Sequence, residues 1–522
     1  MPSPYGATIA YPQSDASVSS LPKQRKPAGN VLTAYFCEFL GTFLLAFTVA
    51  CSPQGMWLPT AIAGVVVAIV YAFMPISGAH INPAVSLASL LAGKMRLLDF
   101  AGYVVAQVFG GVLAVLLFLL SFGLGELTVR VAPHAPFSFG AAAAVEMIYT
   151  AMLCFVSLNV AQSRTMDKNH FYAVAIGFVL LAGSSASRDI SCALLNPALA
   201  LAFSLNGDIG WGCCFMLVEF GGGLIAALCF RICRRDEYVE THVLYEIESA
   251  DRQTFYDITS VDPPSLKARM FCEALGTFWL LITYGLNTIL NTGATPWSAA
   301  AALLSMMYSL ATASGGYFNP AVTLGVVLSG RSKCNRRDGC LYSAVQVLMA
   351  IPVGLFLRYI HSYIPISNSN VGFFAAESVY AWYQIAAIEA LFTFLVVYVV
   401  LTVTISEAHT SSWPNFYFAL AVGFTVVGAA YAASNVSGGY LNPSVALTFA
   451  VEGQPVFHSD ATVSHWPTYL DTLMRILAIA FKIVDYYLRC FLYWIPEIIG
   501  ACAAAVMFRS VYSSEYERKV IQ

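Results

Sequence analysis

A short Asn-Pro signature recurs four times along the chain, and its residues could bind and orient a polar solute. The copies are Asn82-Pro83-Ala84, Asn196-Pro197-Ala198, Asn319-Pro320-Ala321 and Asn442-Pro443-Ser444. Proline at a helix start loses no hydrogen bond, and an asparagine just before it can cap that terminus with its side-chain oxygen. The NH2 group of each asparagine then remains as a donor. One copy would indicate an ordinary helix cap, but four copies in matched contexts predict a repeated functional element.

One glutamate lies in the apolar stretch that precedes each signature. The four are Glu38, Glu146, Glu273 and Glu389. An acidic residue inside a membrane span is a candidate for a functional site by default. We expect these carboxylates to support the signature loops by accepting hydrogen bonds from loop N–H groups, rather than to transfer protons.

The apolar run that each signature opens is short, which favours half-helices. A helix of about ten residues is about 15 Å long, half of the roughly 30 Å apolar core of a bilayer. Two such helices entering from opposite faces would meet in the middle with their positive N-terminal ends facing each other. A water molecule at that point must turn its oxygen to both asparagines, so it cannot relay a proton, and the positive ends repel cations. The pattern predicts a path for water or small neutral solutes.

The composition indicates that lipid surrounds this chain. Of 522 residues, 58% are hydrophobic and only 11% are charged, whereas soluble domains carry roughly 25% charged residues. A cytosolic enzyme is excluded, and the net charge of −3 gives no field that would attract nucleic acid. Apolar runs long enough to span a membrane lie at 32–52, 57–76, 98–122, 138–160, 171–187, 210–232, 268–290, 297–313, 339–361, 380–405, 416–434 and 490–510. We expect an all-α membrane protein with twelve transmembrane helices and four half-helices.

The spans fall into two sets of six separated by a polar stretch. We expect a tail at 1–31, a first channel domain at 32–232, a linker at 233–267, a second channel domain at 268–512 and a tail at 513–522. An even number of spans places both tails and the linker on one side. Most Lys and Arg residues fall on that side, so the positive-inside rule predicts that both termini are cytoplasmic.

The two sets repeat each other. Glu38 and Glu273 begin the similar strings E-F-L-G-T-F and E-A-L-G-T-F, and Gly222 and Gly500 follow Glu219 and Glu497 at the same distance in the last spans. Each half also contains two three-span repeats, which must have opposite orientation because three is odd. Inverted repeats of this kind place a site near the middle of the membrane.

These motifs resemble the aquaporin (major intrinsic protein) family. S-G-A-H-I-N-P-A-V at 77–85 and S-G-G-Y-F-N-P-A-V-T-L-G at 314–325 are similar to its first signature loop, and the resemblance covers about 32–232 and 268–512. An ordinary member has six spans and two signatures. The resemblance therefore implies two right-handed channel bundles fused in tandem. Because the family assembles four six-span units, it also implies a homodimer with four pores in a lipid bilayer.

The resemblance also implies where an outer selectivity filter would lie, and there the chain departs from the family. The usual filter arginine is replaced by Leu199 in the first half and by Val445 in the second, and Leu199-Ala200-Leu201 after Asn-Pro-Ala resembles the superaquaporin subgroup. The other filter positions carry over to Ile62, Ser184 and Ala193 in the first half and to Ala299, Ala430 and Gly439 in the second. Without an arginine the filter loses a fixed charge and several donors. We expect wider, more apolar pores that tolerate glycerol, urea or hydrogen peroxide.

The sequence leaves more than one interpretation open for three further features. Arg188 could substitute for the missing filter arginine or pair locally with Asp189. Glu219 and Glu497 could pair with a partner or form a polar subunit contact, or they could act as a gate or proton sensor. In the insert at 452–489, apolar residues at helical spacing favour an amphipathic helix in the outer membrane interface, with a helix packed over the second pore as the alternative.

Other classes of function have weaker support. The same fold could serve as a poorly conducting scaffold or junction protein, or the chain could be a twelve-helix secondary transporter. One pore could also conduct while the other is closed. The sequence contains no nucleophile–base pair, metal-ligand spacing or nucleotide loop, so we expect no enzyme, no metal and no cofactor.

Overall fold

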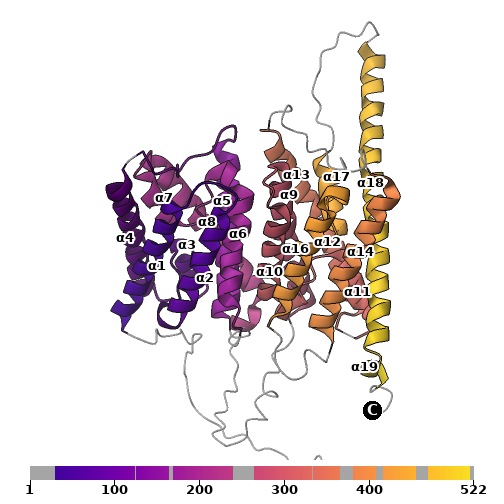
Figure 1. Ribbon diagram of the computed structural model, residues 1–522, viewed down its shortest axis with the longest axis horizontal. Coiled ribbons are helices and arrows are strands. Elements are labelled where there is room, and N and C mark those ends of the chain that lie inside the picture. The colour runs from indigo at the N-terminus through magenta and orange to yellow at the C-terminus, as the bar shows by residue number, and fades with distance from the viewer. Residues whose placement is uncertain are drawn as a thin grey trace, which may run out of the picture.

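The computed structural model describes residues 30–123, 125–163, 169–238, 264–331, 333–364, 380–406, 416–453 and 468–517, and this part of the chain is helical, with no strand (Figure 1). The first half contains the long helices α1 (Val31–Cys51), α2 (Leu58–Ser77), α4 (Leu97–Phe122), α5 (Phe139–Gln162), α6 (Tyr172–Ser191) and α8 (Ile209–Cys233). Its two short helices are α3 (Pro83–Leu91) and α7 (Pro197–Ser204). The short turn η2 (Arg235–Tyr238) follows α8.

The second half repeats this order. Its long helices are α9 (Leu266–Ile289), α10 (Thr295–Ser314), α12 (Arg336–Leu348) continued by α13 (Ala350–His361), α14 (Trp382–Val400) continued by the π-helical η6 (Leu401–Ile405), α16 (Phe418–Ser437) and α18 (Thr468–Val511). The short helices are α11 (Pro320–Ser329) and α17 (Pro443–Glu452), and α19 (Ser514–Glu517) follows α18. Each of the twelve expected spans therefore coincides with a helix or a pair of joined helices.

Ten helical segments of the described chain are long and apolar enough to cross a membrane. The long helices α9 and α10 are outside that set. Both lie in the middle of the molecule, where α10 packs against α5, α6 and α16, and α9 packs against α6, α8 and α13. Most of their residues are buried by protein. Their lower hydrophobicity follows, because a helix covered by other helices has little contact with lipid.

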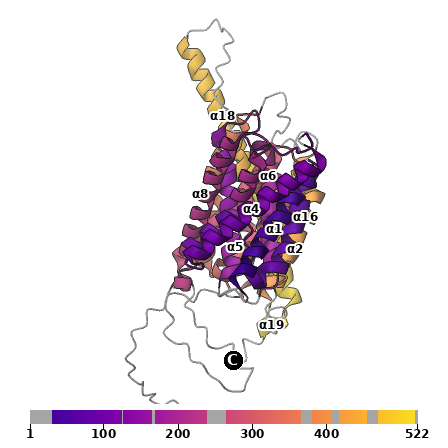
Figure 2. The same ribbon diagram turned by 90° about the vertical axis from the view of Figure 1, so that its left-hand side faces the viewer.

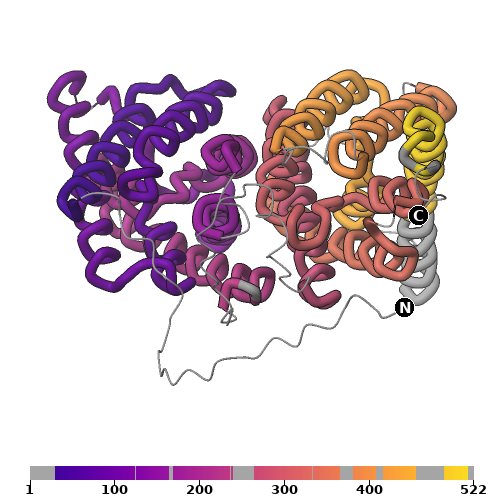
Figure 3. The backbone as a smooth tube through the Cα atoms, turned by 90° about the horizontal axis from the view of Figure 1, so that it is seen from below, coloured from indigo at the N-terminus to yellow at the C-terminus, as the bar shows by residue number. Residues whose placement is uncertain are grey.

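The two halves form separate bundles that lie side by side, with their helices running in the same general direction (Figures 1 and 3). Figure 2 shows the first bundle from its outer side. The contact between the bundles joins α5 and α6 of the first to α9 and α10 of the second. Tyr149 donates to Thr283 Oγ1 at 3.1 Å, and the Trp279 indole donates to the Ile148 carbonyl at 3.2 Å. The buried Arg234 reaches from the end of α8 to the Ser309 carbonyl at 2.8 Å.

The insert before the last span differs from the expectation. The structure has a single helix of 44 residues, Thr468–Val511, that includes Pro496. Residues 468–489 therefore continue directly into the last span, so the prediction of a separate interfacial helix was wrong in this respect. Residues 454–467 lie outside the described part of the chain, as do the first tail up to 29 and most of the linker, 239–263.

Candidate solute pores

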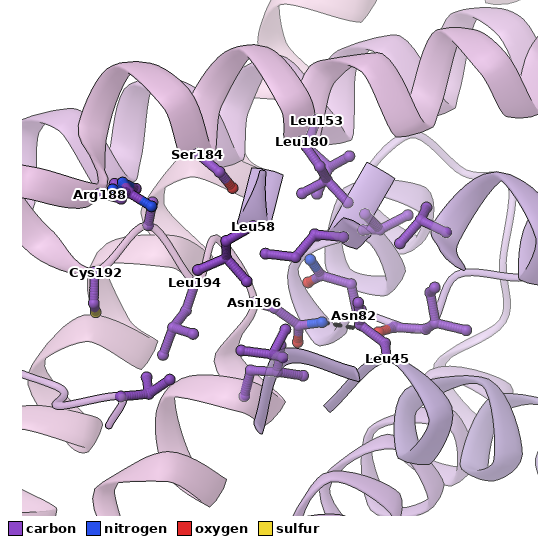
Figure 4. Close-up of a pocket in the computed structure, with 18 of the residues that line it drawn as sticks. Leu45, Leu58, Asn82, Leu153, Leu180, Ser184, Arg188, Cys192, Leu194 and Asn196 are labelled. Carbon is purple, nitrogen blue, oxygen red and sulfur yellow. Dashed lines mark hydrogen bonds between the residues drawn. The ribbon is translucent and has the colours of Figure 1, made fainter. Parts of the chain in front are cut away.

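The two short helices of the first half meet at their N-termini through reciprocal hydrogen bonds. Asn82 caps α3, since its Oδ1 accepts from the Ala84 N–H at 2.8 Å, and its Nδ2 donates to the Leu195 carbonyl at 2.8 Å. Asn196 caps α7 in the same way, and its Nδ2 donates to the Ile81 carbonyl at 2.9 Å. Each asparagine thus binds the residue that precedes the other asparagine. Figure 4 shows the two side chains together, with Ser184 and Arg188 farther along the cavity.

The second half repeats this arrangement with its own pair. Asn319 Nδ2 donates to the Leu441 carbonyl at 2.8 Å, and Asn442 Nδ2 donates to the Phe318 carbonyl at 3.2 Å. Their Oδ1 atoms accept from Ala321 and Ser444 N–H groups. The structure therefore brings the four predicted asparagines together in two pairs.

The reciprocal bonds refine the expected role of the asparagines. A carboxamide NH2 carries two donor hydrogens, and one of them is used to join the two short helices. The other remains for the cavity. Sequence reasoning missed this bond, because it depends on the direction of the carbonyl that precedes each asparagine.

That direction comes from an unusual backbone. The residue before each asparagine has a positive φ in all four loops: Ile81 at 44°, Leu195 at 52°, Phe318 at 50° and Leu441 at 53°. Left-handed conformations at non-glycine residues cost of order 1–3 kcal/mol and persist only where the surroundings fix them. These bulky residues are therefore held in place by other contacts.

The four glutamates supply those contacts. Glu38 Oε2 accepts from the Ile81 N–H at 2.6 Å, and its Oε1 accepts from the Ser77 hydroxyl at 2.6 Å and the His80 N–H at 3.0 Å. Gln107 donates to the same carboxylate at 2.8 Å. Glu273 binds Ser314, Tyr317, Phe318 and Gln346 in the equivalent way.

The glutamates of the second repeat in each half do the same for the other two loops. Glu146 accepts from the Leu195 N–H at 3.0 Å, the Leu194 N–H at 3.3 Å and the Ser191 hydroxyl at 2.8 Å. Glu389 accepts from the equivalent N–H groups of Leu441 at 2.8 Å and Tyr440 at 3.1 Å. All four carboxylates are fully buried. Their geometry fits a support for the loops.

The extra glutamates in the last spans lie beside the second asparagine of each half. Glu219 Oε1 accepts from the backbone N–H of Asn196 at 2.8 Å. Glu497 lies near the equivalent N–H of Asn442, but neither of its buried carboxylate oxygens has a hydrogen-bond partner among the described residues. For Glu219, this placement favours the interpretation of pairing with a partner.

A cavity of about 580 Å³ surrounds the first asparagine pair. It extends from His80 past Asn82 and Asn196 to the loop at Thr128–Ala135. All four expected filter positions line it: Ile62, Ser184, Ala193 and Leu199. Most of the wall is aliphatic, and its polar side chains are those of His80, the two asparagines, two serines and the outer rim.

The cavity around the second asparagine pair is much smaller, about 50 Å³. Its wall includes Asn319, Asn442 and the four expected filter positions of that half, Ala299, Ala430, Gly439 and Val445. Tyr284, Tyr317 and Tyr440 also line it. The two halves therefore share a backbone design and differ in the space that it encloses.

Arg188 lines the first cavity. Its guanidinium donates to the Gly55 carbonyl and lies 3.4 Å from an Asp189 carboxylate oxygen. The structure therefore shows the local ion pair with Asp189 and places Arg188 in the cavity wall, while its substitution for the filter arginine stays a prediction.

Side chains from the first and fourth spans of each half also line the cavities, and sequence reasoning did not select them. In the first half they are Leu45, Val49, Leu153 and Ser157. The counterparts in the second half are Leu280, Tyr284, Val396 and Val400. A signal for them was present, since each position lies at the same distance from the loop-supporting glutamate in its half.

Long apolar helices around inward-facing pairs of half-helices define a multi-pass membrane protein of the channel type. A family model described as "Major intrinsic protein" matches residues 28–230 and again 261–414, and the chain belongs to this family as a tandem of two units. The second match ends before the signature at Asn442.

Individual relatives match about one half of the chain. Glycerol uptake facilitator protein-like 6 of Lactiplantibacillus plantarum is 29% identical over 209 residues, which cover 38% of this chain and 96% of that protein. Aquaporin A of Dictyostelium discoideum is 30% identical over 235 residues, which cover 41% of this chain and 84% of that protein. Among solved structures, the aquaglyceroporin from Plasmodium falciparum matches at 20% identity and a TM-score of 0.36, covering 38% of this chain and 96% of that one.

The support role of Glu38 predicts a large effect from a small change. Glu38→Gln replaces one acceptor oxygen with an NH2 group, so at least one buried donor among Ser77, His80 and Ile81 loses its acceptor. We expect the unfolding free energy to fall by about 2–3 kcal/mol, which is the cost of leaving a buried donor without the charged acceptor that it had. Thermal unfolding of the purified protein measures this change.

Glu126→Gln is the matched control, because Glu126 is exposed and should tolerate the change. If Glu38→Gln unfolded at the wild-type temperature, the support role would be refuted.

Proposed function

We propose that this protein is a passive transmembrane channel for water and small neutral solutes. The observation that carries the proposal is the cavity of about 580 Å³ that passes the paired Asn82 and Asn196 amides. The names of the relatives, an aquaporin and a glycerol uptake facilitator, agree with this class of conducted solute. The channel role leaves no reaction to catalyse, so we propose no enzymatic activity.

Ion and proton exclusion follows from the ends of the short helices. The N-termini of α3 and α7 face each other, and helix N-termini carry partial positive charge. Each asparagine retains one N–H for the lumen, so a water molecule there accepts two hydrogen bonds through its oxygen. A cation is repelled at this point, and a chain of proton-relaying waters is interrupted.

The filter of the first pore favours solutes larger than water. Leu199 replaces the charged side chain expected there, and Ile62 and Ala193 add only aliphatic surface. Ser184 provides the one side-chain hydroxyl at this level. An apolar wall with a single polar edge suits neutral molecules with a hydrocarbon face and hydroxyl or amide groups, such as glycerol and urea. Hydrogen peroxide is small enough to accompany them.

The orientation and assembly follow from the same geometry. We propose that both termini are cytoplasmic and that two copies form a homodimer with four pores. The contact between the halves joins the fourth and fifth spans of one unit to the first and second spans of the next. This head-to-tail contact leaves α1 with α2, and α14 with α16, as complementary unpaired faces. A second copy related by a twofold axis pairs both faces and closes a ring.

The filter proposal predicts a change in selectivity from one substitution. Leu199→Arg narrows the first pore and adds a fixed charge with several donors. We expect glycerol and urea uptake to fall about tenfold or more while water permeability changes less, since discrimination in such pores depends on diameter and lining donors. Stopped-flow light scattering on proteoliposomes, with water, glycerol, urea and hydrogen peroxide as the panel, measures both.

Leu199→Met is the matched control, because it keeps an apolar side chain of similar size. Wild-type vesicles that admit water alone would refute the wide-filter proposal, and vesicles no more permeable than lipid would favour a scaffold role.

The ring proposal predicts which residues hold the dimer. Trp279 and Ile148 meet between the halves, and the residues at the equivalent positions, Leu44 and Leu391, are exposed in the single chain. Leu391→Trp should overfill the contact and shift the protein from dimer to monomer, as read by light scattering after size exclusion. Leu117→Trp, on another exposed face, should leave the dimer intact. A wild-type monomer, or a dimer indifferent to Leu391→Trp, would count against this assembly.

A further inference from the structure

The two halves place different side chains at one equivalent position of the pore wall. Val49 stands eleven residues after Glu38, and Tyr284 stands eleven residues after Glu273. Both line the cavity of their half. The first cavity holds about 580 Å³ and the second about 50 Å³. A phenol ring in place of an isopropyl group is therefore a candidate cause of the difference.

The hydroxyl of Tyr284 occupies polar groups that a solute would need. It donates to the Gly438 carbonyl at 2.7 Å and lies 3.4 Å from the Gly439 carbonyl. The counterparts of these glycines, Cys192 and Ala193, line the open cavity of the first half. Tyr284 thus reaches from α9 to the loop that carries the filter and occupies an acceptor there.

The neighbouring positions are shaped to receive the ring. Where the first half has Ile62, Ser184 and Ala193, the second has the smaller Ala299, Ala430 and Gly439. Only 7% of Tyr284 is exposed. Its ring lies 5.7 Å from that of Phe449 and 6.2 Å from that of Tyr440, measured between centroids. Small filter residues would widen a pore on their own, but here they make room for a bulky residue from another helix.

We propose that Tyr284 closes the second pore at the level of its filter, so that only the first half conducts. This inference rests on the proposed channel function of the fold. The second half keeps its half-helices, asparagine pair and loop-supporting glutamates, since these hold together the bundle whose α9 and α10 form the contact with the first half. Tyr284 is then the residue that determines what the second half admits.

A reciprocal exchange tests this assignment in the full chain. Val49→Tyr should lower the water and glycerol permeability of proteoliposomes to near that of lipid. Adding Tyr284→Val to Val49→Tyr should restore it by about tenfold, because lining residues set the diameter of such a pore. Tyr284→Phe, which keeps the ring, is the matched control and should leave the second pore closed. Protein content and thermal unfolding of each preparation verify that the variants are folded.

A second substitution covers the other narrow side of the cavity. Tyr317 lies where the first half has His80. Combined with Val49→Tyr but without Tyr284→Val, Tyr317→His should not open the second pore. The inference is supported if Val49→Tyr regains flux with Tyr284→Val, either alone or combined with Tyr317→His. It is overturned if Val49→Tyr by itself keeps the wild-type flux. It is also overturned if, in the Val49→Tyr background, Tyr317→His or Tyr284→Phe restores flux, or if neither variant that contains Tyr284→Val restores it. Failure of the channel function itself would appear separately, as wild-type vesicles no more permeable than lipid.

Discussion

The structure depends on one interaction that occurs twice, the reciprocal hydrogen bonding between paired asparagines. Each carboxamide caps its own short helix and donates to the carbonyl that precedes its partner. A half-helix that ends inside a bilayer leaves backbone groups that lipid cannot satisfy. Joining two such ends through their caps satisfies part of this demand and fixes the two N-termini against each other. Everything else in each half positions these two ends.

The glutamates show how that position is maintained. A left-handed isoleucine, leucine or phenylalanine before each asparagine is an unfavourable conformation, and a buried carboxylate is unfavourable in lipid. The two costs offset each other, because the strained loop presents several N–H groups in one direction and the carboxylate accepts hydrogen bonds from them. The same solution in all four loops explains why the repeat is visible in the sequence over such long distances.

Much of this could be predicted from the sequence, because the strongest signals are local or repeated. The Asn-Pro signatures, the four glutamates and the span boundaries follow from helix chemistry, apolar length and internal symmetry. The expected filter residues, which the family resemblance implied, line the two cavities. The lower hydrophobicity of α9 and α10 gave less information about the fold, because it reflects the burial of these two helices between the halves.

The remaining features depend on three-dimensional packing. No local pattern indicates that one N–H of Asn82 is used for the Leu195 carbonyl, or that Tyr284 reaches a loop more than 150 residues away. The insert was misjudged because an amphipathic pattern does not show where a helix ends, and the helix from Thr468 runs on without interruption into the last span. The difference between the two cavities appears only when all wall positions are brought together.

The central claim is that the asparagine pair of the first half forms the point through which solute passes. The most direct measurement compares water permeability and proton leak in proteoliposomes containing the wild type, the Asn82→Ala/Asn196→Ala variant and the Asn319→Ala/Asn442→Ala variant. We expect the wild type to raise water permeability without a proton leak. The first-half variant should lose most of that gain, since its half-helices are no longer joined. A folded first-half variant with unchanged water permeability would contradict the account.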